Sequence, residues 1–446
     1  MIINLIITAQ QQIRAWLDED LLNELEKGNK VNISAPKKLE NYIEISTTRN
    51  VDYYSFEENN PANRLHNICM NITHINSATF RSLIIEALIP KKSWNSKSLY
   101  RTIKAYVRQL MRNKDLLTLL ISKRKQRKIK DLVNAEILKV RVDFTPSDLN
   151  ILVSNHSDLS HEIVVENLNR THKPLIQVME NWDNISSKVC PASQAAALVV
   201  WGEQTRRHAM EIHGFPIEKT HSLGSSRLNN DNFLQFKKSS SINERSNERQ
   251  INLFYPGFGG SHETIEFFTN MLDEINSKGE SFRLTFRPHP LMLSKTIADE
   301  NSNIHELLMI DIPIIDQEVD PIWPILDDSI YNELMKADIV IGTPSTFLLE
   351  AMLLNKKIII DYRKLKTEHS PRELFESRTH FREILNSTSI PKLKSLGDFE
   401  FLAQQVMNSE QDYQHLVRDL IVEPEEKFGT NLKNLAESLL DASKLG

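Results

Sequence analysis

Two short motifs in the C-terminal half carry side chains suited to binding a phosphate group. The first is RPHP, in which Arg287 and His289 follow the alternating stretch SFRLTF and so stand at the carboxyl end of an expected strand. Arg presents a planar fork of N–H donors and His a ring donor, and the flanking prolines stiffen the loop, so little entropy is lost on binding. The motif predicts an anion contact; the alternative is a structural Arg and His on a rigid turn.

The second motif is GTPST, residues 342–346, which separates an apolar strand from an apolar helix. Gly342 ends the strand, and the hydroxyls belong to Thr343, Ser345 and Thr346. The first N–H groups of a helix are unpaired and lie at its positive dipole end, so they and the hydroxyls together favour an anion. The alternative is that Ser345 or Thr346 only caps the helix. We expect both motifs to end neighbouring strands and to hold one phosphate from two sides.

A glycine-rich loop, YPGFGGSHE, follows another expected strand. Gly257 and Gly259 would let the backbone approach a ligand closely, and Ser261 stands where the next helix begins. The loop lacks the spacing of a dinucleotide-binding fingerprint and the lysine of a P-loop. It is expected to form a wall of the binding cleft, with a simple tight turn as the alternative.

Two carboxylates in the N-terminal half are candidates for proton transfer or nucleophilic attack. Asp183 follows a strand in the polar loop of QVMENWDNISSK, and Glu203 follows the strand VVWG. For Asp183 the alternative is an N-capping role before ISSK. The histidines and cysteines show no metal-ligand spacing, and no Asp-x-Asp pair follows a strand, so we expect no metal and no cofactor.

The elements that must position these residues are short apolar strands alternating with helical stretches. The expected strands are Ile2–Ile7, Leu149–Ser154, Leu175–Met179, Ala197–Trp201, Ile251–Tyr255, Phe282–Phe286, Ile339–Ile341 and Lys357–Asp361. This alternation predicts an α/β protein with parallel sheets covered by helices on both faces.

The strands fall into two groups, which predicts two doubly wound, Rossmann-like domains facing a cleft. We expect an N-terminal domain over residues 1–222, a polar linker over 223–250 and a C-terminal domain over 251–446. A mainly helical insertion at about 60–142 interrupts the first domain. In its basic stretch Lys123–Lys130, six of eight residues are Lys or Arg. This stretch is either a solvated helix face or a contact with an anionic membrane or charged glycan.

Composition sets the class of protein and excludes some partners. Of 446 residues, 40% are hydrophobic and 25% charged, as in soluble globular proteins, and the formal net charge of -5 gives no global footprint for nucleic acid. The first residues indicate a strand rather than a signal peptide. No apolar run approaches the ~18 residues of a membrane span. The two cysteines suit a reducing compartment, so we expect a cytoplasmic protein, with peripheral membrane contact as an option.

RPHP, followed some way on by a strand, a Ser/Thr pair and an apolar helix, resembles the nucleotide-binding half of GT-B glycosyltransferases. The pattern is most similar to bacterial capsule sialyl- and Kdo-transferases, with their HP and Ser/Thr motifs, and to CDP-glycerol glycerophosphotransferases. The resemblance implies that His289, Ser345 and Thr346 bind donor phosphate, and that the substrates are a nucleotide-activated sugar and a surface glycan. The acidic-acidic-glycine motif of several sialyltransferases is missing, since Asp18–Asp20 runs into Leu21.

The leading hypothesis is therefore transfer of a sugar, such as Kdo or sialic acid from a CMP-sugar, onto a bacterial surface glycan. In it, residues of the C-terminal domain stabilise the leaving phosphate and a first-domain carboxylate assists the acceptor. The alternatives are polyol-phosphate transfer from a CDP-polyol, nucleotide-sugar epimerisation, and a binding module without catalysis.

Overall fold

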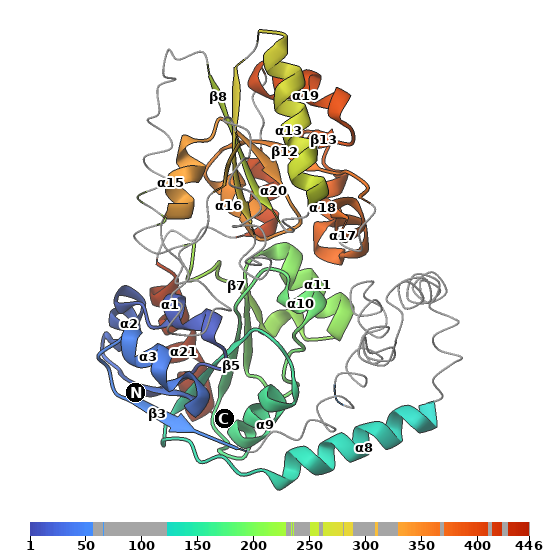
Figure 1. Cartoon of the computed structure of the whole chain (residues 1–446). Helices are drawn as coiled ribbons and strands as arrows, with labels where there is room; N and C mark the ends of the chain where they lie inside the picture. Colours follow the sequence, from blue (N-terminus) through green and yellow to red (C-terminus); the bar gives the residue numbers. More distant parts are fainter. Residues whose placement is uncertain are drawn as a thin grey trace. The chain divides into compact units, whose positions relative to one another are not determined.

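The structure is a computed structural model (Figure 1), and it describes residues 1–56, 66, 123–228, 233, 235, 250–257, 262–279, 281–288, 308–310, 329–365, 370–408, 413–421 and 427–445. The chain divides into two compact units. Unit 1 comprises Met1–Arg227, Ser377–His380 and Leu420–Gly446, and unit 2 comprises Leu228–Glu376 and Phe381–Asp419.

Unit 1 is built on a parallel sheet of seven strands in the order β3-β2-β1-β4-β5-β6-β7. The strands are β1 (Ile2–Ile6), β2 (Lys30–Pro36), β3 (Val51–Tyr54), β4 (Leu149–Ser154), β5 (Leu175–Met179), β6 (Ala197–Val200) and β7 (Thr220–Ser222). Chain order reverses between β1 and β4, which are adjacent. This is the topological switch point, the place outside the strand ends where open α/β sheets bind ligands.

Both faces of this sheet are buried. Successive side chains of each strand point to opposite sides, so each strand contributes to two separate cores. In β4, Ile151 and Val153 belong to one core while Leu152 belongs to the other. The first core receives side chains from α1 (Ile13–Trp16), α2 (Glu19–Glu26), α3 (Glu40–Ser46) and α21 (Phe428–Leu445). The second receives them from α8 (Lys123–Lys139), α9 (Leu159–Asn169), α10 (Asn184–Ser187) and α11 (Glu203–His213). Strands buried on both faces explain the apolar runs in the sequence.

The C-terminal helix α21 belongs to unit 1, which differs from the predicted domain of residues 251–446. Phe428 lies with its ring centroid 5.7 Å from that of Trp16, and Thr430 Oγ1 donates to Glu24 Oε2 at 2.7 Å. A Cβ on Gly429 would lie 2.8 Å from Glu24 Cβ, so glycine permits close packing of α21 on α2. The apolar face of α21 completes the first core, so this helix belongs to unit 1 although it follows unit 2 in the sequence.

Unit 2 repeats the architecture with six parallel strands in the order β10-β9-β8-β11-β12-β13. The strands are β8 (Ile251–Gly257), β9 (Phe282–Pro288), β10 (Leu308–Ile310), β11 (Ile339–Gly342), β12 (Lys357–Asp361) and β13 (Lys392–Leu393). The helices are α13 (His262–Ser277), α15 (Ser329–Lys336), α16 (Phe347–Leu353), α17 (Pro371–Ser377), α18 (Arg382–Asn386), α19 (Phe399–Asn408) and α20 (Gln414–Leu420). Its switch point lies between β8 and β11. Two doubly wound sheets confirm the predicted α/β class.

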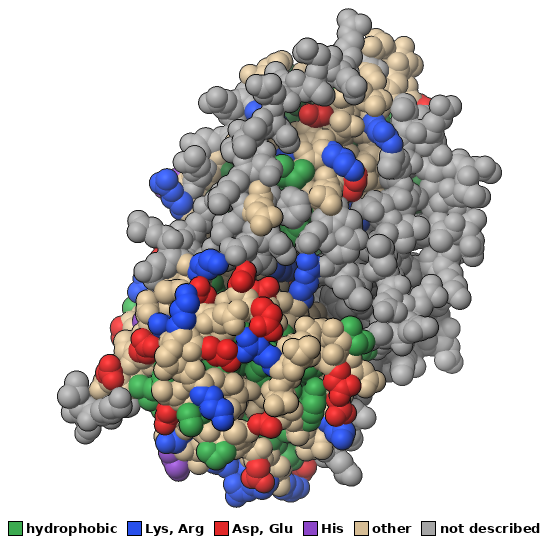
Figure 2. Space-filling model, turned by 90° about the vertical axis from the view of Figure 1, so that its left-hand side faces the viewer, with side chains coloured by type: hydrophobic (Ala, Val, Ile, Leu, Met, Phe, Trp, Pro, Cys, Tyr) green, Lys and Arg blue, Asp and Glu red, His purple; other side chains and the backbone are tan. Residues whose placement is uncertain are grey.

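The predicted insertion and linker are described only in part. Within the insertion, the structure describes His66 and residues 123–142, where α8 forms a long helix (Figure 1). Among the residues that the structure describes, no helix is long and apolar enough to span a membrane. On the face of unit 1 that carries α2 and α3, acidic and basic side chains are interspersed (Figure 2). That face therefore presents no patch of one sign to a nucleic acid.

Candidate functional site

The strand ends at the switch point of unit 2 bring together three of the predicted phosphate-site residues. In the β8–β9 pairing, Pro256 lies opposite Arg287 and Gly257 opposite Pro288. From the other side, the Thr343 hydroxyl after β11 donates to the Pro256 carbonyl at 2.7 Å. Arg287 is 8% exposed, so its side chain is held within the unit. Arg287 and Thr343 thus lie on either side of the end of β8, where Gly257 stands, although they are far apart in sequence.

The glycines at these strand ends are required by packing. A Cβ on Gly257 would collide with the ring of Phe286, and a Cβ on Gly342 would lie 2.5 Å from Leu348 Cδ1. Real Cβ atoms do not approach neighbours so closely, so any larger residue would displace these core side chains. Glycine here lets the two strands end against a close-packed core.

In the turn after Gly342, the Thr346 hydroxyl makes no hydrogen bond to the described residues. Thr343 Oγ1 and Ser345 Oγ lie 3.4 Å apart, and the Ser345 N–H donates to the Thr343 carbonyl at 2.7 Å. Thr346 immediately precedes α16, yet its side chain makes no capping hydrogen bond. The alternative that Thr346 only caps the helix therefore does not hold. Within the described part of the chain, the Thr346 hydroxyl has no hydrogen-bond partner, and the residue is partly exposed.

Three predicted donor-site residues lie outside the residues that the structure describes. These are His289, Gly259 and Ser261. Their roles therefore remain predictions of the sequence.

Asp183 lies in unit 1 in the loop after β5, where its carboxylate is held in an ion pair. Lys188 Nζ is 2.9 Å from Asp183 Oδ2, and the Ser187 hydroxyl donates to the same oxygen at 3.2 Å. Burial alone would raise the pKa of Asp183, but Lys188 and His380 lower it well below its ordinary value. Asp183 stands at the N-cap position of α10, as the alternative expected, but its side chain makes no capping hydrogen bond. The carboxylate stays ionised and is already bound by Lys188 and Ser187. Its low pKa makes it a weak base near neutral pH.

His380 is a buried partner of this loop, and its role was not predicted from the sequence. Its Nδ1 and the Ser186 hydroxyl are 2.9 Å apart, and its carbonyl accepts a hydrogen bond from Gln204 Nε2 at 3.0 Å. The Trp182 indole N–H donates to Gln204 Oε1 at 2.7 Å, and the ring packs edge-on against His380 with centroids 4.8 Å apart. Burial lowers the pKa of His380 to about 3, so the ring is neutral at physiological pH. Together these contacts fix the loop after β5.

Glu203, the second predicted carboxylate, lies at the first position of α11. The Ser222 hydroxyl donates to Glu203 Oε1 at 2.9 Å, and Arg206 Nη1 lies 3.4 Å from Oε2. The carboxylate thus ties the start of α11 to the end of β7.

Glu180 is a second carboxylate of the loop after β5, beside Asp183, and it has the chemistry expected of an acid–base group. It directly follows β5 and is 7% exposed, and the Trp16 indole N–H donates to Oε2 at 2.5 Å. Burial raises the pKa of Glu180 to about 7, although Trp16 and Arg227 act to lower it. A group that titrates near neutral pH can both accept and release a proton. The signal in the sequence was only its place as the first residue after a buried strand.

No metal centre accompanies these residues in the described parts of either unit, where no three His, Cys, Asp or Glu side chains are grouped to hold an ion.

Comparisons with known proteins return solved structures only. No family model matches the sequence, and no curated protein matches it significantly. Similar structures include the UDP-GlcNAc 2-epimerase of Neisseria meningitidis bound to UDP-GlcNAc, with 13% identity over 99% of this chain and 100% of that one and a TM-score of 0.44. Acinetobacter baumannii MurG has 9% identity over 98% and 99% of the two chains, with a TM-score of 0.46.

A glycosyltransferase of Rickettsia africae has 11% identity over 100% of this chain and 96% of that one, with a TM-score of 0.41. At identities and TM-scores this low, the similarity says nothing of what this chain does.

Proposed function

We propose that the protein is a GT-B-type glycosyltransferase that moves a sugar from a nucleotide donor to a bacterial surface glycan. The observation that supports this most is the grouping of Arg287 and Thr343 about Pro256 at the switch point of unit 2. Doubly wound sheets bind nucleotides at this place. CMP-linked sialic acid or Kdo is the donor class that the sequence resemblance favours.

In this proposal unit 2 holds the donor phosphate. The guanidinium of Arg287 offers paired donors to phosphate oxygens, and Thr346 contributes the hydroxyl that has no partner in the described residues. His289, by the sequence motif, adds a ring donor. As the sugar leaves, negative charge grows on the phosphate oxygens, so contacts that strengthen with this charge lower the barrier.

We assign the proton transfer to Glu180 rather than to Asp183 or Glu203. In a single-step transfer, the acceptor oxygen bonds to the anomeric carbon while the bond from that carbon to the phosphate oxygen breaks. The electron pair leaves with the nucleotide, and the hydroxyl proton passes to a carboxylate. Glu180 suits this step because its pKa of about 7 lies near the working pH, whereas Asp183 is bound in its ion pair with Lys188.

A donor panel tests the proposal and separates it from its alternatives. UDP-, CMP- and CDP-linked sugars and CDP-glycerol are incubated with the full chain and acceptor glycans, and the products are identified by mass spectrometry. Glycoside formation supports the proposal, whereas a transferred polyol phosphate or an epimerised donor would each replace it. Nucleotide binding without turnover of any donor would leave a binding module.

The donor site is tested by nucleotide affinity, measured by calorimetry with CMP, CDP and UDP. Thr346→Val removes the free hydroxyl and should weaken the best nucleotide by roughly 3- to 10-fold, the worth of a single hydrogen bond. Thr430→Val removes a hydroxyl in unit 1 and serves as the matched control. Equal affinities of both variants and the parent would move the donor site elsewhere.

We also propose that the protein works in the cytoplasm with α8 against an anionic membrane. Arg127, Lys128 and Lys130 are exposed, as are Leu132 and Leu138, at 52% and 54%. Val133 and Ile137 instead pack into the second core of unit 1. The free side of α8 therefore offers basic and apolar side chains together, a combination typical of helices that lie on lipid.

A further inference from the structure

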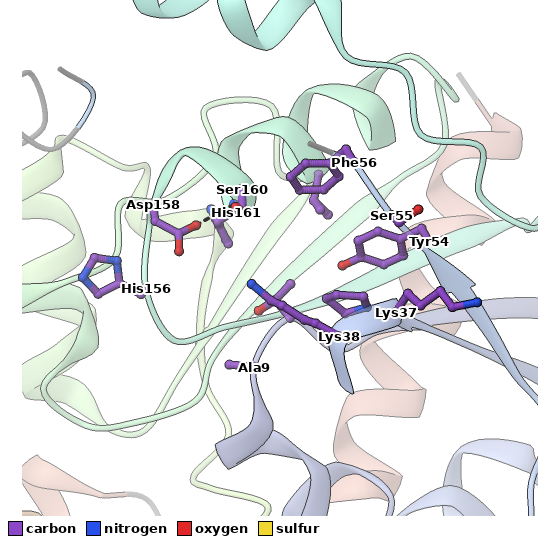
Figure 3. A pocket seen from close by; sticks show the side chains of 13 residues that line it. Ala9, Lys37, Lys38, Tyr54, Ser55, Phe56, His156, Asp158, Ser160 and His161 are labelled. Atoms are coloured by element: carbon purple, nitrogen blue, oxygen red, sulfur yellow. Dashed lines mark hydrogen bonds between the residues drawn. The ribbon is translucent and has the colours of Figure 1, made fainter. Parts of the chain in front are cut away.

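Unit 1 has a pocket at its own switch point, on the carboxyl edge of its sheet (Figure 3). Four neighbouring strands contribute to it through the residues that follow them. Thr8 and Ala9 follow β1, Lys37 and Lys38 follow β2, Ser55 and Phe56 follow β3, and Asp158 and Ser160 stand between β4 and the first turn of α9. The pocket is thus set at the position where doubly wound sheets bind ligands.

The size of the pocket limits what it can hold. Its volume is about 140 Å³, equal to the space of roughly five water molecules at ~30 Å³ each. Sites for drug-sized ligands occupy about 300–1,000 Å³. The pocket therefore suits a single ring with its substituents and is too small for a whole nucleotide sugar.

One wall of the pocket is aromatic. The rings of Tyr54 and Phe56 stack with centroids 6.4 Å apart and an angle of 11°, and Phe144 packs edge-on against Tyr54 at 5.4 Å. Such flat faces pack well against the C–H face of a sugar ring, which is apolar although the rim of the ring carries hydroxyls.

The opposite side offers a cation and an anion. In Figure 3 the Lys38 ammonium, the Tyr54 hydroxyl and the Asp158 carboxylate are directed toward the same space. Asp158 Oδ1 accepts the N–H of His161 at 2.8 Å as the cap of α9, and a carboxylate has further lone pairs for a ligand. Donors and acceptors side by side match hydroxyl groups, which both donate and accept, better than they match an ion of one sign.

The Tyr54 hydroxyl adds a second indication of a ligand. Tyr54 is 7% exposed, and among the described residues its hydroxyl donates to the Ile7 carbonyl at the long distance of 3.5 Å. A good O–H···O bond is about 2.7–2.8 Å, so this buried donor is poorly satisfied. A ligand hydroxyl in the pocket would satisfy it.

The floor of the pocket is fixed before any ligand binds. Gln12 Oε1 accepts the backbone N–H groups of Thr8 and Ala9 at 2.7 and 3.1 Å, and Gln12 Nε2 donates to the Val153 carbonyl at 3.0 Å. This buried amide ties the end of β1 to the end of β4. A site already ordered in this way loses little entropy on binding.

We propose that this pocket binds one neutral, hydroxyl-rich sugar ring of the acceptor glycan. Tyr54 and Phe56 form its stacking wall, and Lys38 and Asp158 bind the ring hydroxyls. The assignment to an acceptor rests on the proposed glycosyl transfer, while the binding of a sugar ring does not.

Neighbouring lysines supply a matched pair of variants for the test. In Figure 3 the Lys38 side chain runs toward the Asp158 side, whereas the Lys37 ammonium is directed away from it. Both residues are exposed, so neither substitution should disturb folding. Saturation-transfer NMR with the full chain and a panel of methyl glycosides of neutral hexoses and N-acetylhexosamines measures binding directly.

For the best glycoside, Lys38→Met should weaken affinity about 10-fold or more, as expected for a charge-assisted hydrogen bond. Lys37→Met should weaken affinity much less than Lys38→Met, because the Lys37 ammonium is directed away from Asp158, and Phe56→Ala should weaken affinity as well. The proposal is overturned if no glycoside of the panel binds, or if both lysine variants bind as the parent does.

The outcomes also separate this inference from the proposed function. If glycosides bind in a Lys38-dependent way but no donor is ever turned over, the pocket stands and the transferase proposal fails. If a sugar donor is turned over while Lys38→Met leaves the KM for the acceptor unchanged, the transferase proposal stands and the pocket is not the acceptor site.

Discussion

Replacing Glu180 by glutamine is expected to stabilise unit 1 increasingly as the pH rises. In the folded chain burial raises the pKa of Glu180 from 4.5 to about 7. Between these values the folded state holds a proton that the unfolded state has released, so the parent loses stability as the pH rises through this window. Glutamine keeps an acceptor for the Trp16 indole N–H but never carries the buried charge.

The magnitude follows from the size of the shift. Each pH unit of differential protonation corresponds to about 1.4 kcal/mol, and the window spans about two and a half units. The difference in unfolding free energy between Glu180→Gln and the parent should therefore grow by about 3 kcal/mol from about pH 4 to about pH 9. Other titrating groups are common to both proteins and cancel in this comparison.

Urea unfolding at the two pH values measures this difference. Tryptophan fluorescence is a suitable probe because Trp16, Trp182 and Trp201 are buried in unit 1. As a control, Glu203→Gln changes a partly exposed carboxylate, for which a surface ion pair contributes less than about 1 kcal/mol. If the advantage of Glu180→Gln is the same at both pH values, Glu180 titrates as an ordinary carboxylate, and its role in proton transfer loses its basis.

Three further results are expected. His289→Ala should lower kcat by about 10²-fold or more with little change in donor affinity, and Thr346→Ala should be milder; full activity of a folded His289→Ala would remove RPHP from the donor site. Gly342→Ala should cost about 1–3 kcal/mol in urea unfolding because its Cβ meets a core leucine, whereas Gly397→Ala has nothing within 4 Å and serves as the control. Neutralising Arg127, Lys128 and Lys130 of α8 should weaken sedimentation with anionic liposomes by about 1 kcal/mol per charge, and salt should weaken the parent likewise; insensitivity to both would exclude electrostatic docking.

The central strands of both sheets could be predicted from sequence because they are buried on both faces. Strands Leu149–Ser154, Leu175–Met179 and Lys357–Asp361 have the predicted bounds. Strands β2 and β3 were not predicted; they lie at one edge of the unit 1 sheet and are only partly buried. Their sequences, KVNISAP and VDYY, therefore lack the apolar run that marks a central strand.

The sequence could predict site residues that stand directly after strands. It could not predict carboxylates whose pKa depends on side chains far away in the sequence. Arg287 and Thr343 were expected at the ends of neighbouring strands, but this prediction was wrong because β8 lies between β9 and β11. Both residues instead lie next to Pro256 of β8. The loop after β5 was also expected to contribute, but its carboxylates could not be ranked. The properties of Glu180 and Asp183 depend on Trp16 and His380, which lie far from them in sequence.

The return of α21 to unit 1 also sets the order in which the protein can be completed during synthesis. Phe428, Leu432 and Ala436 belong to the same core as the strands of residues 1–227. A ribosome adding about 5–20 residues per second needs on the order of 10–40 s to translate the roughly 200 residues between them. During this time the face of α2 that α21 covers remains open to water, while unit 2 receives its last strand. The first unit to be synthesised is therefore the last to close its core.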